Sequence, residues 1–235
     1  MCQVLAGRNL SHVLNATWSR HADLTGQQRG AIQDLSYGTL RWYGSLQATL
    51  GLLLVQPLQD EALRCLLLVG LYQLEYSKAP PHAVVDHAVR TAQALGKGRA
   101  KGLVNAVLRN FLRKREALQE EIRRDEVARH SHPRWWIDKL KAQYPQSWDT
   151  ILDAANRHPP MTLRVNRRVA SAQGYLDMLH EKGLEGRIVG ATAIMLGQPV
   201  AVEQLPGFRD GMVSVQDAGA QHAATLLDVQ NGMRV

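Results

Sequence analysis

The chain has 235 residues, of which 45% are hydrophobic, so it is long enough for one large domain or two small ones with a sizeable core. Its formal net charge of +7 at pH 7 favours a polyanionic partner over a cationic one. We find no signal-peptide pattern, and the longest apolar run, residues 50–55, falls far short of the roughly 20 residues that a membrane helix needs. We therefore expect a soluble, cytoplasmic protein with no membrane contact.

The first part of the chain, to about residue 157, has the period of successive helices. Apolar residues recur about every 3.6 positions over 32–53. Asp60 and Glu61 place acidic groups where the next helix begins. The paired prolines 80 and 81 interrupt the pattern, and a new helix is expected from about 82 to 95. A further amphipathic helix follows over 103–112, which predicts an α-helical bundle.

The two cysteines, Cys2 and Cys65, are far apart in the sequence and form no CxxC pair. No histidine stands near them at metal-ligand spacing, so a zinc site is not expected. Cys65 lies in an apolar stretch, where a free cysteine behaves as a small buried hydrophobic residue.

A basic run without any acidic residue extends from Lys97 to Arg115. It consists of Lys97, Arg99, Lys101, Arg109, Arg113, Lys114 and Arg115. The glycine-rich loop 96–102 at its head can present side chains and backbone amides to phosphates. This loop follows a helix rather than a strand, so it is not a dinucleotide-binding fingerprint. A solvated helix face is the alternative interpretation of the run.

Two further helices are expected to begin at 132–136 and 144–148, where aromatic residues at helical spacing favour packing over base stacking. After the paired prolines 159 and 160 the pattern changes. Strands are predicted at 161–166, 187–189, 193–196 and 212–215, with a helix over 171–181. This order indicates an α+β arrangement and a domain boundary near the prolines.

No catalytic constellation is recognisable from the residues alone. Walker A, GxSxG and HExxH patterns are missing from the sequence. His82 and His87 fall on a predicted helix surface. Asp217 stands where a helix begins, with Gln221 one turn further, so Asp217 is interpreted as an N-cap. The residues therefore predict a binding apparatus with an RNA-suited surface.

Segments 68–74, 80–83 and 101–109 together resemble the NusB-like RNA-binding domain. Segment 157–166, with 205–211 and 215–217, resembles the entry to the catalytic part of Sun/Fmu-type 16S rRNA (cytosine-C5) methyltransferases. The resemblance implies a mainly α chain: a NusB-like helical bundle over 1–125, a helical linker over 126–158, and a small α+β domain over 159–235. That last domain would lead into a Rossmann-like methyltransferase fold.

Enzymes of this kind transfer a methyl group from S-adenosylmethionine to carbon 5 of a cytosine that a cysteine thiolate has activated at carbon 6. The family carries that cysteine in Pro-Cys and Thr-Cys motifs downstream of a Gly-rich cofactor loop. Neither motif occurs in this chain, and Cys2 and Cys65 match neither. S-adenosylmethionine is therefore the expected cofactor of the full-length enzyme, while this chain is expected to bind no cofactor, to hold no catalytic residue and to be inactive alone.

The expected partner is 16S ribosomal RNA, and the chain is expected to be a monomer. The residues expected to contact RNA are Lys97, Arg99, Lys101, Arg109, Arg113, Lys114, Arg164 and Asn166. Arg164 and Asn166 would lie nearest the target nucleotide. The alternative is a non-enzymatic NusB-like module that binds RNA and a protein partner in transcription regulation. The α+β half after Pro160 argues against that alternative.

The last five residues, 231–235, resemble a turn and the first residues of a buried strand. On the family's pattern this strand would be the first of the Rossmann-like sheet, whose carboxyl end holds the cofactor loop. Asp217 and Gln221 are then expected to form a docking edge for that sheet.

Overall fold

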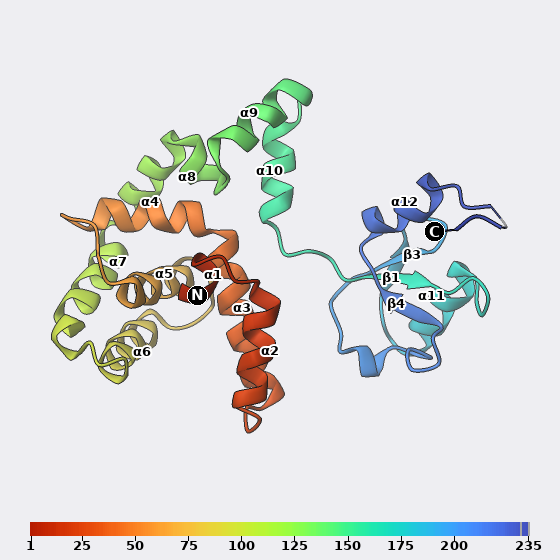
Figure 1. The fold of residues 1–235 in the computed structure, drawn as a ribbon, viewed down its shortest axis with the longest axis horizontal. Helices are drawn as coiled ribbons and strands as arrows, with labels where there is room; N and C mark the ends of the chain where they lie inside the picture. Colours follow the sequence, from red (N-terminus) through yellow and green to blue (C-terminus); the bar gives the residue numbers. More distant parts are fainter. Residues whose placement is uncertain (231, 235) are drawn as a thin grey trace. The chain divides into compact units, whose positions relative to one another are not determined.

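The computed structural model describes residues 1–230 and 232–234. Its contacts divide the chain into two compact units, Met1–Arg157 and His158–Val235, which are described separately below (Figure 1). The first unit is helical and the second contains the sheet. The mainly helical fold class with a small α+β region is confirmed.

The first unit consists of helices joined by short connections. Their bounds are α1 Cys2–Leu5, α2 Leu10–Arg20, α3 Gly26–Arg41, α4 Tyr43–Leu53, α5 Glu61–Tyr76, α6 Pro81–Ala94, α7 Lys101–Arg124, α8 Glu126–His130, α9 Arg134–Gln143 and α10 Trp148–Asn156. A short 3-10 helix, η1, spans Gly98–Ala100. The apolar period over 32–53 is divided at Trp42, where the backbone leaves the helical conformation between α3 and α4.

Side chains at the helix starts explain where several of these helices begin. Asn9 caps α2 by accepting from the amide of His12, and Asp60 caps α5 through Oδ1, which accepts from the amides of Ala62 and Leu63. Such caps satisfy donors that the first helical turn leaves free. Pro81 takes the first position of α6, where its missing N–H costs nothing.

The main core of the first unit lies between α4, α5, α6 and α7. Its fully buried members include Leu67, Leu68, Leu71 and Leu108. Two glycines permit close helix approach: a Cβ at Gly38 would meet the Tyr72 ring at 2.0 Å, and one at Gly70 would lie 3.1 Å from Leu108. This packing fixes α5 at the centre of the unit.

Helices α8, α9 and α10 enclose a smaller core of Ile137, Leu140 and Leu152. Ser131, with a left-handed backbone at φ 57°, ends α8. Its hydroxyl oxygen accepts from the amide of Ser45 in α4 at 3.2 Å. These helices therefore belong to the first unit, although 126–158 as a separate linker stays a prediction, as do the boundaries 1–125 and 159–235.

The second unit contains β1 Thr162–Val165, α11 Ala172–Glu181, β2 Gly186–Ile188, β3 Ala193–Leu196, η2 Val202–Gln204, β4 Val213–Val215 and α12 Ala218–Leu226. The strands form one antiparallel sheet in the order β2-β3-β1-β4. Leu163 pairs with Ile194 on one side and Val215 on the other. All four predicted strands and the helix over 171–181 are present within a residue or two.

The second core lies between α11 and the sheet. Leu163, Tyr175, Leu179 and Ile194 are fully buried there. The Tyr175 hydroxyl donates to the carbonyl of Pro206 at 2.8 Å, and burial raises its pKa to about 12. Helix α12 contacts β1 and β3. The strand expected at the end of the chain involves Asn231 and Val235, which lie outside the described residues.

Candidate nucleic-acid interface

The loop between α6 and α7 holds its basic residues in three different settings. Lys97 pairs with the Asp60 carboxylate at 2.5 Å, and this hydrogen bond holds the pKa of Asp60 below its usual value. Lys101 Nζ donates to the neutral amide oxygen of Gln93 at 3.2 Å. Arg99 in η1 is exposed and makes no ion pair with the described residues. The loop therefore offers Arg99 and Lys101 as cations without an acidic partner, whereas Asp60 already neutralises much of the positive charge of Lys97.

Arg109 and Arg113 lie one turn apart on the exposed side of α7. Arg109 Nε donates to Asn105 Oδ1 and Arg113 Nη2 donates to Asn110 Oδ1, each at 2.9 Å. Neutral amides orient a guanidinium without cancelling its charge, so both arginines stay available to an anion. The next residue, Lys114, is exposed and marks a kink in α7, with φ −109° and ψ 15°.

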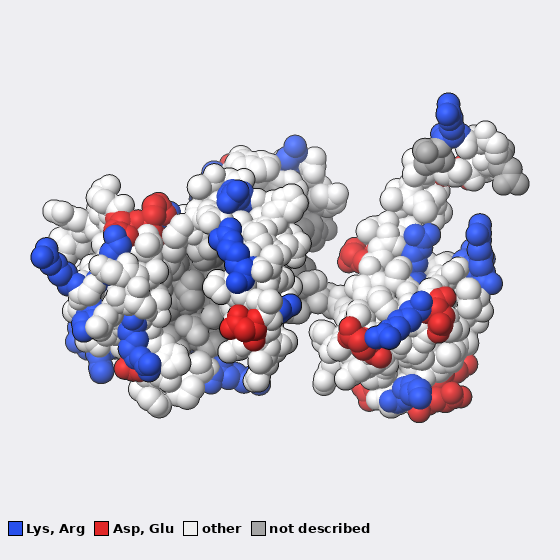
Figure 2. All heavy atoms as spheres, turned by 60° about the horizontal axis from the view of Figure 1, so that its bottom comes forward, with Lys and Arg blue, Asp and Glu red and all other residues white. Residues whose placement is uncertain are grey.

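Beyond this kink, several basic residues of α7 have acidic partners. Arg115 Nε pairs with Glu75 Oε2 at 2.9 Å and thereby ties α7 to α5. Further along α7, Arg123 and Arg124 pair with acids three residues earlier. Within the run from Lys97 to Arg115, the uncompensated charge therefore lies in the loop and in α7 up to Lys114. On the face drawn in Figure 2, Lys and Arg side chains are scattered over both units, with Asp and Glu side chains among them.

The second unit has an open pocket beside the end of β1, with a volume of about 440 Å³. We call this pocket the arginine concavity. It is lined by Arg164, Val165, Asn166, Arg167, Arg168, Thr192, Gly211, Val213 and Ser214. None of these residues is acidic. Its three arginines are exposed, so the concavity combines uncompensated positive charge with a shape that can receive a small anionic group.

Asn166 organises the backbone at this concavity. Its Oδ1 accepts from the amide of Arg168 at 3.1 Å, and its Nδ2 donates to the carbonyl of Gly211 at 3.0 Å. Arg164 Nη1 lies 3.4 Å from Gln216 Oε1, which draws this arginine along the sheet toward β4. The structure thus brings Arg164 and Asn166 together in one pocket. The Asn166 side-chain amide holds the backbone of Arg168 and Gly211 in place.

Arg167 and Arg168 line the same concavity but were not among the residues predicted from the sequence. The signal for them was present, because two consecutive arginines directly follow the strand that contains Arg164. The asparagine before them favours a turn, and arginines are among the residues that contact phosphates.

Some tryptophans of α9 and α10 pack against the core of these helices, and one is exposed to solvent. Trp136 and Trp148 pack against the small core of α8, α9 and α10, as the helical spacing indicates. Trp135 is 66% exposed and meets the Trp136 ring edge-on, with ring centroids 5.6 Å apart. Packing therefore accounts for two of these tryptophans and not for Trp135.

Asp217 and Gln221 have different tasks. Asp217 caps α12, since its Oδ2 accepts from the amide of Ala220 at 3.2 Å, which is the predicted role. Gln221 turns inward: its Oε1 accepts from the Thr192 hydroxyl at 2.8 Å, and its Nε2 donates to the carbonyl of Leu163 at 3.3 Å. The polar atoms of Gln221 thus bind β1 and the loop before β3, and the docking edge expected of Asp217 and Gln221 stays a prediction.

His82 and His87 are exposed on α6, as predicted. Among residues 1–230 and 232–234, no group of three His, Cys, Asp or Glu side chains could hold a metal ion. In the same residues, every helix is too short or too polar to cross a bilayer.

Comparison with family models matches the two regions separately. Residues 2–113 match the NusB family, and residues 132–203 match a domain described as Methyltr_RsmF/B-like, ferredoxin-like. The first match covers α1 to α7 up to the kink. The second covers α9, α10 and the sheet up to β3, including the strand end where the arginine concavity lies.

Curated relatives match over most of the chain. Ribosomal RNA small subunit methyltransferase B of Pseudomonas syringae pv. tomato is 44% identical, covering 99% of this chain and 54% of the relative. The protein of the same name from Escherichia coli O127:H6 is 38% identical, covering 97% and 53%. A probable ribosomal RNA small subunit methyltransferase B of Coxiella burnetii is 40% identical, covering 89% and 50%. The chain thus spans about half the length of these relatives.

A solved structure, the crystal structure of PH0851, has the same fold as this chain. The TM-score is 0.63 with 16% sequence identity, over 93% of this chain and 51% of that one.

Proposed function

We propose that this chain, whose two regions match the NusB family and the Methyltr_RsmF/B-like ferredoxin-like domain, is the RNA-recognition portion of a 16S rRNA (cytosine-C5) methyltransferase that uses S-adenosylmethionine. In this proposal its partner is ribosomal RNA in the cytoplasm. The observation that supports it most is the arginine concavity, because three arginines and no acid line it within the region that matches the methyltransferase-associated domain.

Each unit would contribute to RNA binding in its own way. In the first unit, Arg99, Lys101, Arg109, Arg113 and Lys114 would contact phosphates, with Lys97 contributing less because it pairs with Asp60. In the second, Arg164, Arg167 and Arg168 would hold the RNA backbone near the target nucleotide, and Asn166 would keep the turn that presents them. Phosphate contacts of this kind set the register of an RNA without reading its bases.

The non-enzymatic NusB-like module is the weaker proposal. The NusB match supports it for the helical unit, yet that match ends at residue 113. The ferredoxin-like match over 132–203 favours the methyltransferase interpretation instead.

Substitution in the arginine concavity tests the proposal directly. The double variant Arg167→Gln, Arg168→Gln is expected to weaken binding to a structured 16S rRNA fragment at least about tenfold, because charge-assisted contacts to phosphate would be lost. Fluorescence anisotropy measures this affinity. Arg187→Gln is the matched control, since Arg187 is an exposed arginine of the same sheet outside the concavity. Equal affinities for all three proteins would refute the assignment.

Cofactor binding provides an independent test. We expect no detectable heat from S-adenosylmethionine in titration calorimetry with this chain, because the family's Gly-rich cofactor loop does not occur in it. The intact fold is checked in the same sample by circular dichroism. Micromolar binding of S-adenosylmethionine would overturn the expectation that this chain recognises RNA without taking part in methyl transfer.

A further inference from the structure

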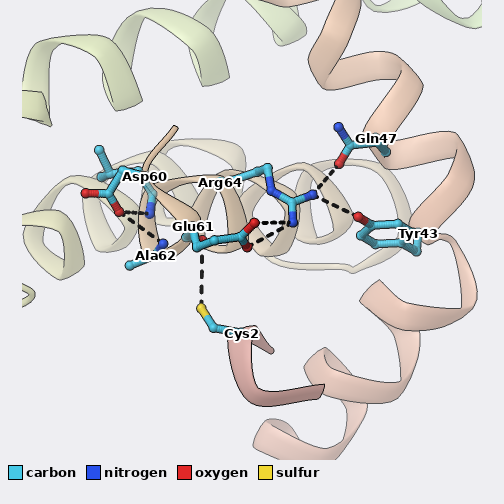
Figure 3. Close-up of polar contacts among 8 residues, drawn as sticks. Cys2, Tyr43, Gln47, Asp60, Glu61, Ala62 and Arg64 are labelled. Atoms are coloured by element: carbon cyan, nitrogen blue, oxygen red, sulfur yellow. Dashed lines mark hydrogen bonds and ion pairs between the residues drawn. The ribbon is translucent and has the colours of Figure 1, made fainter. Parts of the chain in front are cut away.

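The two cysteines of the chain meet at the contact between α1 and α5. Cys2 is the first residue of α1, which packs on α5, and its thiol is exposed. Cys65 lies in α5 and is buried. The Cys2 thiol donates to the carbonyl oxygen of Glu61, with 3.7 Å between sulfur and oxygen (Figure 3). The exposed thiol therefore points at the first turn of α5.

Helix geometry brings the Cys65 thiol toward the same carbonyl. Cys65 follows Glu61 by four residues in α5. Helical side chains lean back toward the N-terminus, over the turn that contains the carbonyl four residues earlier. Both sulfurs therefore converge on Glu61. Consistent with this, burial and, to a smaller extent, a hydrogen bond with Cys2 together raise the pKa of the Cys65 thiol to about 12.

The surface that receives Cys2 is held firmly. Arg64 donates to the Tyr43 hydroxyl and to Gln47 Oε1, both at 2.8 Å, which ties α5 to α4 (Figure 3). The same guanidinium pairs with both carboxylate oxygens of Glu61 at 2.8 and 2.9 Å. With Asp60 capping the helix start, this first turn of α5 has little freedom to move away from α1.

We propose that Cys2 and Cys65 are a redox pair, which peroxide converts into a disulfide that joins α1 to α5. In the first step hydrogen peroxide oxidises the exposed Cys2 thiol to a sulfenic acid and releases one water. In the second step the Cys65 sulfur attacks the Cys2 sulfur, the S–O bond breaks, and the hydroxyl leaves with the Cys65 proton as a second water. The two thiols lose two electrons in total, and the peroxide gains them.

Such a bond would have a defined structural effect. It would close a loop that contains α2, α3 and α4, and a closed loop of this length limits the unfolded chain much more than the folded one. A thiol reagent would reverse it. Disulfides in reducing compartments are usually transient and either catalytic or redox-sensing. This inference does not depend on the proposed RNA binding.

Peptide mapping tests the pair without ambiguity, because the chain has only these two cysteines. The native chain is treated with hydrogen peroxide, denatured, alkylated and digested. We expect a cross-linked peptide containing Cys2 and Cys65, its disappearance after dithiothreitol, and a rise in Tm of about 5 °C or more in the oxidised chain. In Cys2→Ser, a surface substitution, Cys65 is expected to stay reduced because no peroxide-accessible thiol lies beside it.

Three results would overturn the proposal. One is overoxidation of Cys2 to a sulfinic acid while Cys65 remains open to alkylation. Another is a dimer linked through Cys2 as the main product, and the third is the absence of any oxidation. Because these readouts come from the unmodified sequence and from a surface variant, they do not depend on whether a Cys65 variant folds.

Discussion

His130 is a fully buried titratable residue at the junction of α8 and α10. Its ring packs edge-on against Trp148, with centroids 5.3 Å apart, and its Nδ1 lies 3.3 Å from a carboxylate oxygen of Asp153. Neither ring nitrogen makes a well-formed hydrogen bond within the described residues. Burial lowers the pKa of His130, and the charge of Arg129 lowers it further, against a smaller opposing effect of Asp153.

This burial makes the stability of the first unit depend on pH. Because the pKa is lower in the folded chain, the unfolded chain binds more protons between the folded value and the ordinary value of about 6.5. The stabilisation is therefore complete above the ordinary value and decreases as the pH falls below it. We expect the urea midpoint to fall between pH 7.5 and 5 and to fall less in His130→Phe. A midpoint that changes equally in His130→Phe and in the exposed control His82→Gln would assign the loss to other groups.

Helix α3 begins with a reciprocal pair of hydrogen bonds. The Thr25 hydroxyl accepts from the amide of Gln28 at 3.2 Å, and the Gln28 side-chain oxygen accepts from the amide of Thr25 at 2.9 Å. Such a capping box satisfies two donors that the first turn would otherwise leave to solvent.

Loss of this cap should reduce stability measurably. Thr25→Ala is expected to lower the free energy of unfolding by about 0.5–2 kcal/mol, whereas Thr25→Ser keeps the hydroxyl and should lose only a small part of that. Urea denaturation followed by circular dichroism compares the two. If Thr25→Ala and Thr25→Ser were equally stable, the hydroxyl would not be what starts α3.

The elements differ in how far the sequence predicts them. Helices α5 and α6 are predictable because Asp60 and Pro81 mark their starts and their apolar faces are regular. Helix α2 was not predicted, although Leu10, Val13, Leu14 and Trp18 stand at helical spacing on its less exposed side. Helix α7 extends to Arg124, twelve residues beyond the predicted end, because salt bridges such as Glu120–Arg123 support its polar second half.

The candidate site was also predictable only where a local sequence pattern marks it. The run of basic residues in the sequence predicted the cations of α7. Only the fold shows which of these cations have an acidic partner. Lys97 has its partner, Asp60, 37 positions earlier, and Arg115 pairs with Glu75 across two helices. Arg167 and Arg168 become part of the site only when the turn after β1 brings them beside Gly211 and Ser214. Long-range pairing of this kind leaves no local pattern in a sequence.

At the scale of the whole molecule, each unit carries its own basic surface on its own core. The first unit offers the loop before α7 and the exposed side of that helix, and the second offers the arginine concavity. The central claim is that both surfaces bind RNA mainly through its phosphates. Affinity should then fall steeply with salt, with a log-log slope of about −0.7 to −0.9 for each phosphate neutralised.

The most direct test measures this slope for the chain and for the triple variant Arg164→Gln, Arg167→Gln, Arg168→Gln, using a structured 16S rRNA fragment. The variant removes three cations, so its slope should be less negative by about 2 to 3, while Arg187→Gln should keep the slope of the unchanged chain. The same slope for the chain and the triple variant, or an affinity that hardly changes with salt, would contradict phosphate binding at the arginine concavity.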